Sequence, residues 1–230
     1  MRAYLRISET SLMERKLRVK QMLIELEENI ESRKETDRVM WFSMWVLLSV
    51  ASFGIAWFLM IYFLIKRRND HFSRQEELES LILSRLRQGN KEKPRQENTA
   101  SVSAKTENSK FFRNAQAGAL STLIIFPAFY VFYFLEMDLQ KHEEHEHTFL
   151  AETISLAQDS GLSINLDGFM PTKRFALDKY LILTVVTCGF AAVYWLYRIF
   201  KDYNQHFERQ WKLEDDLLRF FKSINNSKTS

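Results

Sequence analysis

The sequence is poor in the residues that form covalent and metal cross-links or interrupt helices. It holds one cysteine, three prolines and six glycines in 230 residues. Because Cys188 has no second cysteine, we expect neither an intrachain disulfide nor a metal site made of several cysteines. The N-terminus lacks the basic and then apolar pattern of a secretory signal. Thirty-two basic residues nearly balance 29 acidic ones, and this small excess does not indicate nucleic-acid binding.

Three long stretches without a charged residue are the main feature that is present. They cover residues 40–65, 114–135 and 180–197. A run of about 20 apolar residues, at about 1.5 Å per residue, is long enough to cross the hydrocarbon core of a bilayer. The pattern predicts an all-α fold, a polytopic membrane protein with three transmembrane helices extended by amphipathic helices.

The distribution of basic residues predicts an orientation for these spans. Lys and Arg number 19 on the side of the first loop and the C-terminus, and 13 on the other side. The positive-inside rule then places the first loop and the C-terminus in the cytoplasm. The predicted location is the cell membrane, as a multi-pass protein in contact with the lipid bilayer.

The regions outside the spans are mostly charged. Residues 12–38 space Val19, Leu23, Leu26 and Ile30 as in a short coiled coil or in a surface helix packed on its neighbours, and both interpretations stay open. A polar composition predicts a disordered linker between the first two units. The predicted units are an N-terminal amphipathic helix (1–39), a first span with its stalk (40–87), the linker (88–110), a second span with its stalk (111–158), a loop (159–179), a third span with its stalk (180–224) and a tail (225–230).

The first and third stretches are followed by copies of one sequence signature. A shift of 135 residues aligns the copies without a gap, and 11 of 26 positions agree where chance gives about two. We interpret this agreement as an internal duplication. The shared string is N-x-H-F-x-R-Q-x-x-L-E. Its residues are Asn69, His71, Phe72, Arg74, Gln75, Leu78 and Glu79 in the first copy, and Asn204, His206, Phe207, Arg209, Gln210, Leu213 and Glu214 in the second.

A fainter copy follows the second stretch. At a shift of 64, Tyr133, Asp138, His142 and Glu144 match residues of the last copy, although four matches are also compatible with coincidence. Each unit then consists of an apolar helix that continues into an amphipathic stalk. With three alternating spans, the second stalk points opposite to the other two. Matching stalks on one side predict a contact surface for a homo-oligomer or for another subunit of a complex.

The third unit carries motifs that resemble a known family. These motifs, within residues 184–218, are T-x-G before a group of aromatics, then Y-W-x-Y-R, then D-x-N-x-H. They resemble the uncharacterised prokaryotic membrane family called domain of unknown function 4234. The resemblance implies membrane residence and a prokaryotic origin, and it implies no activity. The residues that carry it are Thr187, Gly189, Tyr194, Trp195, Tyr197, Arg198, Asp202, Asn204 and His206.

The densest group of potential metal ligands is the run K-H-E-E-H-E-H that begins at residue 141. On a helix, His142 and His145 are one turn apart, and with His147 they form a candidate site for a divalent ion such as zinc. Solvated charge on a stalk is the interpretation that we prefer, so we predict no metal, cofactor or catalytic residue. His71 and His206 recur in both strong copies, but their spacing does not focus the signature residues on one point without a further partner.

Other residues of the spans and their ends are expected to make structural contacts. Basic side chains just beyond the spans are positioned to contact anionic lipid, and they are Lys66, Arg67, Arg68 and Lys201. Small residues predict close helix packing, and they are Gly54, Ala56, Gly118, Gly189 and Ala191.

The sequence favours a non-enzymatic integral membrane interaction or scaffold protein that displays its stalks for homo- or hetero-oligomeric assembly. The first alternative is a small channel or transporter subunit, although ionisable residues, which such proteins place inside their spans, are missing there. The second alternative is a metal-binding membrane enzyme that uses the cluster from His142 to His147.

Overall fold

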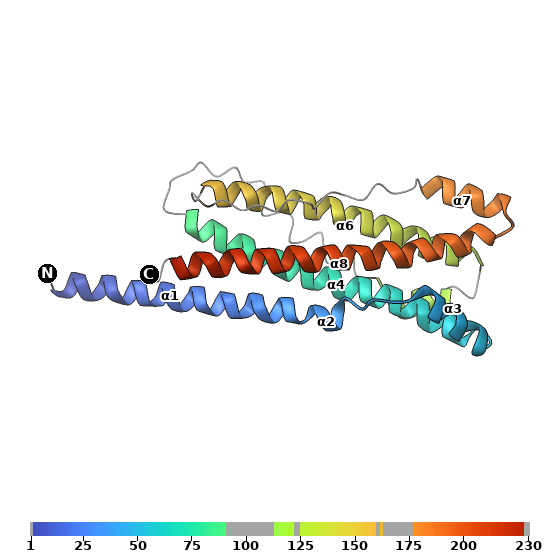
Figure 1. Cartoon of the computed structure of the whole chain (residues 1–230), viewed down its shortest axis with the longest axis horizontal. Coiled ribbons are helices and arrows are strands. Elements are labelled where there is room, and N and C mark those ends of the chain that lie inside the picture. The colour runs from blue at the N-terminus through green and yellow to red at the C-terminus, as the bar shows by residue number, and fades with distance from the viewer. Residues whose placement is uncertain (1, 91–112, 122–124, 160–161, 163–176, 228–230) are drawn as a thin grey trace.

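The protein is a bundle of helices in which the three longest lie side by side (Figure 1). The computed structural model describes residues 2–90, 113–121, 125–159, 162 and 177–227, and within these residues all regular structure is helical. The helices are α1 (Arg2–Glu31), α2 (Arg33–Thr36), α3 (Phe42–Ala51), α4 (Ile55–Asn90), α5 (Ala115–Ser121), α6 (Ile125–Asp159), α7 (Leu177–Val186) and α8 (Phe190–Ser227).

Two of the long helices begin at a reversal of the chain. The ring of Trp45 in α3 lies 5.8 Å from that of Phe63 in α4, so α3 folds back onto α4. Likewise Tyr180 of α7 stacks on Trp195 of α8, with their ring centroids 5.4 Å apart. Each of these charge-free stretches is therefore a short helix that packs on the first turns of a long one.

Both reversals use the same backbone geometry. Phe53 and Gly54 have φ angles of 52° and 91°, and Cys188 and Gly189 have φ angles of 50° and 96°. These values lie in the left-handed region, which glycine adopts without steric cost. Gly54 and Gly189 therefore turn the chain, whereas the sequence predicted that they pack helices together.

A hydroxyl group caps the long helix after each reversal. The Oγ of Ser52 accepts a hydrogen bond from the backbone N–H of Ala56 at 2.8 Å, and the Oγ1 of Thr187 accepts one from that of Ala191 at 2.9 Å. A side-chain acceptor of this kind satisfies a donor that the first turn of a helix leaves unpaired. The duplicated Gly and Ala thus mark a duplicated turn and helix start.

The three predicted transmembrane helices are wrong. No helix among the described residues is both long enough and apolar enough to cross a membrane. A helix of 10 residues such as α3 or α7 spans about 15 Å, about half the hydrocarbon thickness of a bilayer. The reversals at residues 52–54 and 187–189 divide two stretches, and the third is divided between α5 and α6. The predicted polytopic fold, the cell-membrane location and the cytoplasmic C-terminus are corrected on the same ground.

The long helices α4, α6 and α8 all run in one direction, and α1 runs in the opposite one (Figure 1). Their N-terminal halves share one apolar cluster, which includes Leu64 of α4, Leu135 of α6 and Ile199 of α8. Their C-terminal halves share a second cluster with Leu26 and Ile30 of α1. The prediction that the second unit points opposite to the others is therefore wrong. Of the two interpretations of residues 12–38, the structure favours a helix whose apolar residues, such as Leu26 and Ile30, pack on neighbouring helices.

A band of buried polar side chains separates the two apolar clusters. Several of its members are charged and are exposed by 5% or less, so their charges depend on partners inside the protein. The residues of this polar band come from all three parallel helices. They are Arg67, Arg68, His71, Arg74, Gln75, Asp138, Glu143, Glu146, Asp202, His206, Gln210 and Glu214.

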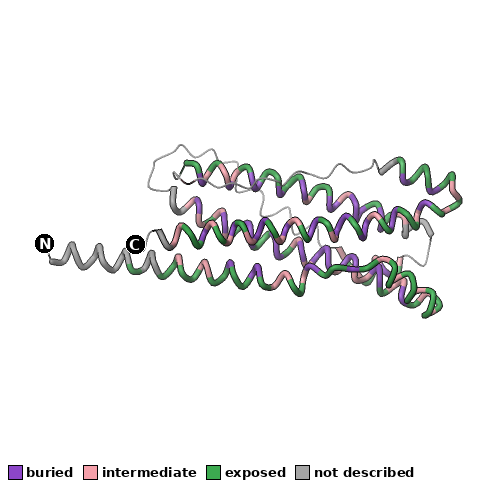
Figure 2. Tube along the Cα trace, viewed as in Figure 1, coloured by how far each residue is buried: buried purple, intermediate pink, exposed green. Residues whose placement is uncertain are grey.

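Large apolar side chains are exposed at the opposite end of the bundle from the chain termini, over α3 and α7 (Figure 2). Phe53 is fully exposed, and other large side chains there are more than two-thirds exposed. They are Leu47, Val50, Ile55, Val185, Val186 and Phe190. Most of the predicted linker at 88–110 and of the loop at 159–179, and the second half of the tail at 225–230, lie outside the described residues.

We predict opposite effects for substitutions at two neighbouring residues of the first reversal. Gly54→Ala introduces a Cβ at a φ of 91° and is expected to lower the free energy of unfolding by about 1–2 kcal/mol. Phe53→Gly, at a fully exposed position with a φ of 52°, relieves strain without loss of packing and is expected to leave that free energy unchanged or to raise it. Denaturant unfolding of both variants tests this, and equal destabilisation by the two would contradict it.

Candidate functional site

Three histidines meet at the centre of the polar band. His71 lies on α4, His142 on α6 and His206 on α8, one from each parallel helix. Their ring centroids form a nearly equilateral triangle, with sides of 5.1, 5.3 and 5.4 Å. One ring nitrogen from each histidine lies within 4.8 Å of the other two. These are the residues that shifts of 135 and 64 align in the sequence, so the site lies where the repeated units converge.

The donor atoms of this histidine triad are shielded from solvent. The side chains of His71 and His206 are fully buried. His142 has intermediate exposure, but its Nε2 atom is buried and has no hydrogen-bond partner. On its other side the His142 ring stacks on Phe72 at a centroid distance of 4.1 Å, which holds it in place.

Two carboxylates face the outer nitrogens of the triad. Asp37, just after α2, lies 2.8 Å from the Nδ1 of His71, and Glu143 of α6 lies 3.3 Å from the Nδ1 of His206. A carboxylate accepts a hydrogen, so it favours the tautomer that carries its proton on Nδ1. The Nε2 atoms of these two rings face each other at a hydrogen-bonding distance of 3.1 Å, and which of them donates depends on the tautomers of the two rings.

Burial disfavours the protonated form of all three rings. It lowers the pKa of His206 to about 4, against the opposing effect of Glu143. It also lowers the pKa of His71, although Asp37 acts in the other direction, and it lowers that of His142 together with the two neighbouring histidines. The triad therefore consists of neutral imidazoles, which is the form that binds a metal ion.

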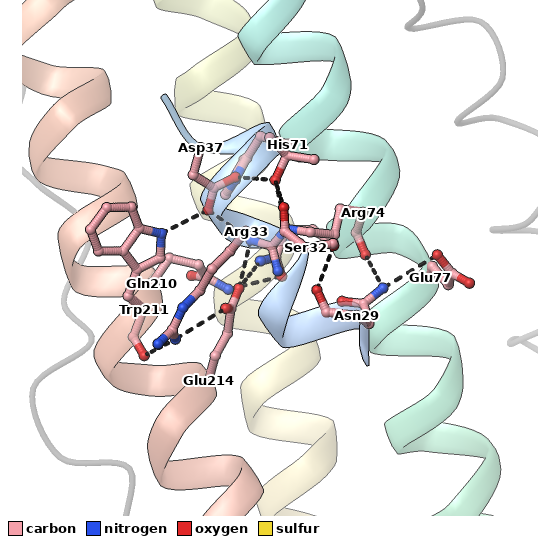
Figure 3. A network of polar contacts seen from close by, with 12 residues as sticks. Asn29, Ser32, Arg33, Asp37, His71, Arg74, Glu77, Gln210, Trp211 and Glu214 are labelled. Atoms are coloured by element: carbon pink, nitrogen blue, oxygen red, sulfur yellow. Dashed lines mark hydrogen bonds and ion pairs between the residues drawn. The ribbon is translucent and has the colours of Figure 1, made fainter. Parts of the chain in front are cut away.

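Asp37 is fixed by a network of donors from three helices (Figure 3). Besides His71, it accepts hydrogen bonds from Arg74 at 2.8 Å and from the indole N–H of Trp211 at 2.9 Å. Burial alone would raise the pKa of Asp37, but His71 and then Arg74 hold that pKa well below its usual value. The carboxylate thus stays charged and ties the N-terminal arm to α4 and α8.

A layer of amides and a carboxyl group lies one helical turn beyond the triad. Gln75, Glu146 and Gln210 each follow a triad histidine by four residues, so they share its face of the helix. Gln210 donates a hydrogen bond to Gln75 across the bundle at 2.9 Å, and Gln75 donates one to Glu214. Burial raises the pKa of Glu146 well above its usual value, and the nearby carboxylates of Glu79, Glu143 and Glu214 add to this shift.

The structure separates the three histidines of the run at residues 141–147. Only His142 belongs to the triad. His145 lies 3.0 Å from Glu79, and His147 is exposed, so these three do not converge on one ion. The metal candidates of the sequence therefore contribute one residue to the observed cluster.

Most residues of the repeat signature face the interior of the bundle. Leu78 and Leu213 pack in the second apolar cluster, and Phe207 packs in the first. The other buried members are Asn69, Arg74, Gln75, Glu79, Gln210 and Glu214, while Phe72, Asn204 and Arg209 are half-buried. The signature thus defines the polar core and does not form an exposed surface of paired stalks.

The remaining predicted positions have structural contacts. Arg67 and Arg68 are buried, Arg68 in an ion pair with Asp138 at 2.9 Å, so neither reaches the surface where a lipid headgroup would bind. Lys66 pairs with Asp70 at 2.6 Å. Lys201 is exposed, Ala56 and Ala191 are buried, and a side chain added at Gly118 would meet Ile65.

Sequence reasoning placed Glu146 on the same helix face as His142, but it missed Asp37 and Glu143 as parts of the site. Asp37 lies outside the repeat, and its role depends on how the N-terminal arm docks. The faint third copy did align His142 with His206, and that alignment was the signal for the triad. Comparison with protein families, curated proteins and solved structures gives no match for this chain. The resemblance to domain of unknown function 4234 stays a prediction.

We predict that the Asp37 carboxylate is essential for stability. Asp37→Asn leaves buried donors on His71 and Arg74 without a charged acceptor, and it is expected to lower the free energy of unfolding by about 3–5 kcal/mol. The control is Asp215→Asn, which weakens the half-exposed pair with Arg33 and is expected to cost less than about 1 kcal/mol. Denaturant unfolding compares the two, and similar losses would contradict the role of Asp37.

Proposed function

We propose that this protein binds one divalent transition-metal ion, such as zinc, through His71, His142 and His206. The observation that carries the proposal is the convergence of three imidazole nitrogens within 4.8 Å of one another inside the bundle. Imidazole is a preferred ligand of zinc and of the neighbouring divalent ions, and three histidines with no cysteine suit this class.

The distances fit a single ion. Two nitrogens bound at about 2.0–2.1 Å with tetrahedral angles lie about 3.3 Å apart. The Nε2 atoms of His71 and His206 are 3.1 Å apart, close to that separation. A small inward movement of His142 therefore completes the set of three ligands.

The carboxylates beside the outer ring nitrogens also support the proposal. Metal-binding histidines typically donate their other N–H to a carboxylate, which sets the tautomer and the ring orientation. Asp37 occupies this place for His71, and Glu143 lies 3.3 Å from the Nδ1 of His206, at ion-pair distance but without a hydrogen bond. Without an ion the facing Nε2 atoms of His71 and His206 have only each other as partners, whereas a cation between them would bind a lone pair of each.

We predict that the purified protein binds one Co²⁺ or Zn²⁺ ion per chain. His142→Ala removes one ligand and is expected to weaken binding by about 100-fold or more, because the remaining two imidazoles do not hold the ion tightly. The matched control is His147→Ala, an exposed histidine of the same helix, which is expected to bind like the wild type. Titration followed by visible absorption of Co²⁺ measures the affinities, and equal binding by the two variants would contradict the triad.

A second candidate function is homo-oligomeric assembly, favoured by the exposed apolar side chains of α3 and α7. Contiguous apolar surface of this kind is typical of protein contact sites. Val50 of the first repeated unit and Val186 of the last one are 73% and 72% exposed. A second copy of the chain offers the same surfaces for pairing.

Substitution of both valines tests this candidate. Val50→Lys with Val186→Lys places charges on the apolar surface and is expected to convert an oligomer into a monomer. The control is Ser43→Lys, which adds a charge to an exposed polar position of α3. Sedimentation equilibrium measures the mass of each form. A wild-type protein that is already monomeric at micromolar concentration would exclude this candidate.

A further inference from the structure

We propose that the bound ion carries one water molecule and that Glu146 holds this water, so that the centre is of the open, reactive type. This inference rests on the proposed metal site and adds the identity and place of its fourth ligand. The water would lie on the side of the triad that faces the layer of Gln75, Glu146 and Gln210.

The triad leaves one position of a four-coordinate ion for a further ligand. Among the described residues, the group of potential ligands that lie close enough to share an ion consists of the three histidines alone. Zinc sites with three protein ligands complete their coordination with water, in contrast to closed structural sites with four. The donor set therefore fits the open class.

Glu146 supplies an acceptor for such a water. It is 2% exposed, and both of its carboxyl oxygens are buried without a hydrogen-bond partner. A buried carboxyl group in this state is costly unless a donor reaches it. Glu146 lies one turn from His142, at the position where Gln75 and Gln210 meet across the bundle, so its side chain faces the same axis.

The neighbouring amide offers a second acceptor. The Oε1 atom of Gln210 is also buried without a hydrogen-bond partner. A water bound to the ion has two hydrogens, and Glu146 and Gln210 together accept both. A buried water typically makes about three hydrogen bonds or equivalent contacts, which this position provides.

The opposite side of the triad does not suit a metal-bound water. Arg67 and Arg68 precede His71 by four and three residues on the same helix, so they lie one turn before the triad. Their guanidinium groups are donors without acceptor capacity. A metal-bound water, which donates its hydrogens, is therefore directed toward Glu146.

This arrangement has a chemical consequence. A zinc ion lowers the pKa of its bound water to about 7, and a carboxyl group beside the water accepts its hydrogen bond and helps to orient the nucleophile. The chemical class is thus hydrolysis or hydration of a small molecule by a metal-bound hydroxide.

The test compares the Co²⁺ form of the wild type with that of Glu146→Gln, which keeps the shape and replaces the ionisable carboxyl group with a neutral amide. In the wild type the visible spectrum is expected to change with a single ionisation as pH rises, and in the variant the midpoint is expected to move by about one pH unit or more, with one Co²⁺ still bound. The matched control is Glu144→Gln, at an exposed position of the same helix, which is expected to titrate like the wild type.

The possible outcomes separate this inference from the proposed function. An unchanged midpoint in Glu146→Gln would overturn the role of Glu146 while the metal site stands, and so would loss of Co²⁺ binding by a folded variant, because Glu146 would then be a ligand itself. Failure of the wild type to bind Co²⁺ would overturn the proposed function. If the variant does not fold, X-ray absorption of the wild-type zinc form decides, since three imidazoles and one oxygen ligand without a ring support the inference and four imidazoles contradict it.

Discussion

The structure depends on the burial of three neutral imidazoles between two apolar clusters, with the Nε2 atoms of two of them facing each other at 3.1 Å. Burial of polar groups is unfavourable unless each finds a partner. On the outer side, Asp37 forms a hydrogen bond with the Nδ1 of His71, and Glu143 lies 3.3 Å from the Nδ1 of His206. On the inner side the Nε2 of His142 has no protein partner, and the Nε2 atoms of His71 and His206 have only each other. A shared cation is the simplest group that satisfies all three, and binding it would stabilise the folded state by mass action.

The arrangement follows from repetition combined with parallel packing. Three helices that run in the same direction and carry a histidine at the same height bring like residues together around a common axis, as subunits do in a symmetric trimer. The same geometry stacks Leu64, Leu135 and Ile199 before the triad and the glutamine and glutamate layer after it. Asp37 breaks this symmetry, because the N-terminal arm supplies it to one of the three histidines only. The arm therefore links the fold of α1 to the geometry of the triad.

The all-helical class and the duplication could be predicted from the sequence, but the direction of the units could not. A run such as residues 40–65 has the length and composition of a transmembrane helix, and only Ser52 and Gly54 mark the turn within it. That signal is easily overlooked, because glycine is common inside transmembrane helices as well. The wrong spans then imposed alternating directions, which kept His142 apart from His71 and His206. The contacts of Asp37 and Glu143 with the histidine rings are tertiary contacts, and no local sequence pattern predicts them.

The central claim is that one ion lies between the three imidazoles, and anomalous X-ray diffraction of crystals grown with zinc tests it most directly. Data collected on both sides of the zinc absorption edge locate the ion without reference to the protein chain. The account predicts one peak per chain, about 2.0–2.1 Å from a ring nitrogen of each of His71, His142 and His206. A peak at His145 or His147 instead, or no peak between the three helices at saturating zinc, would contradict it.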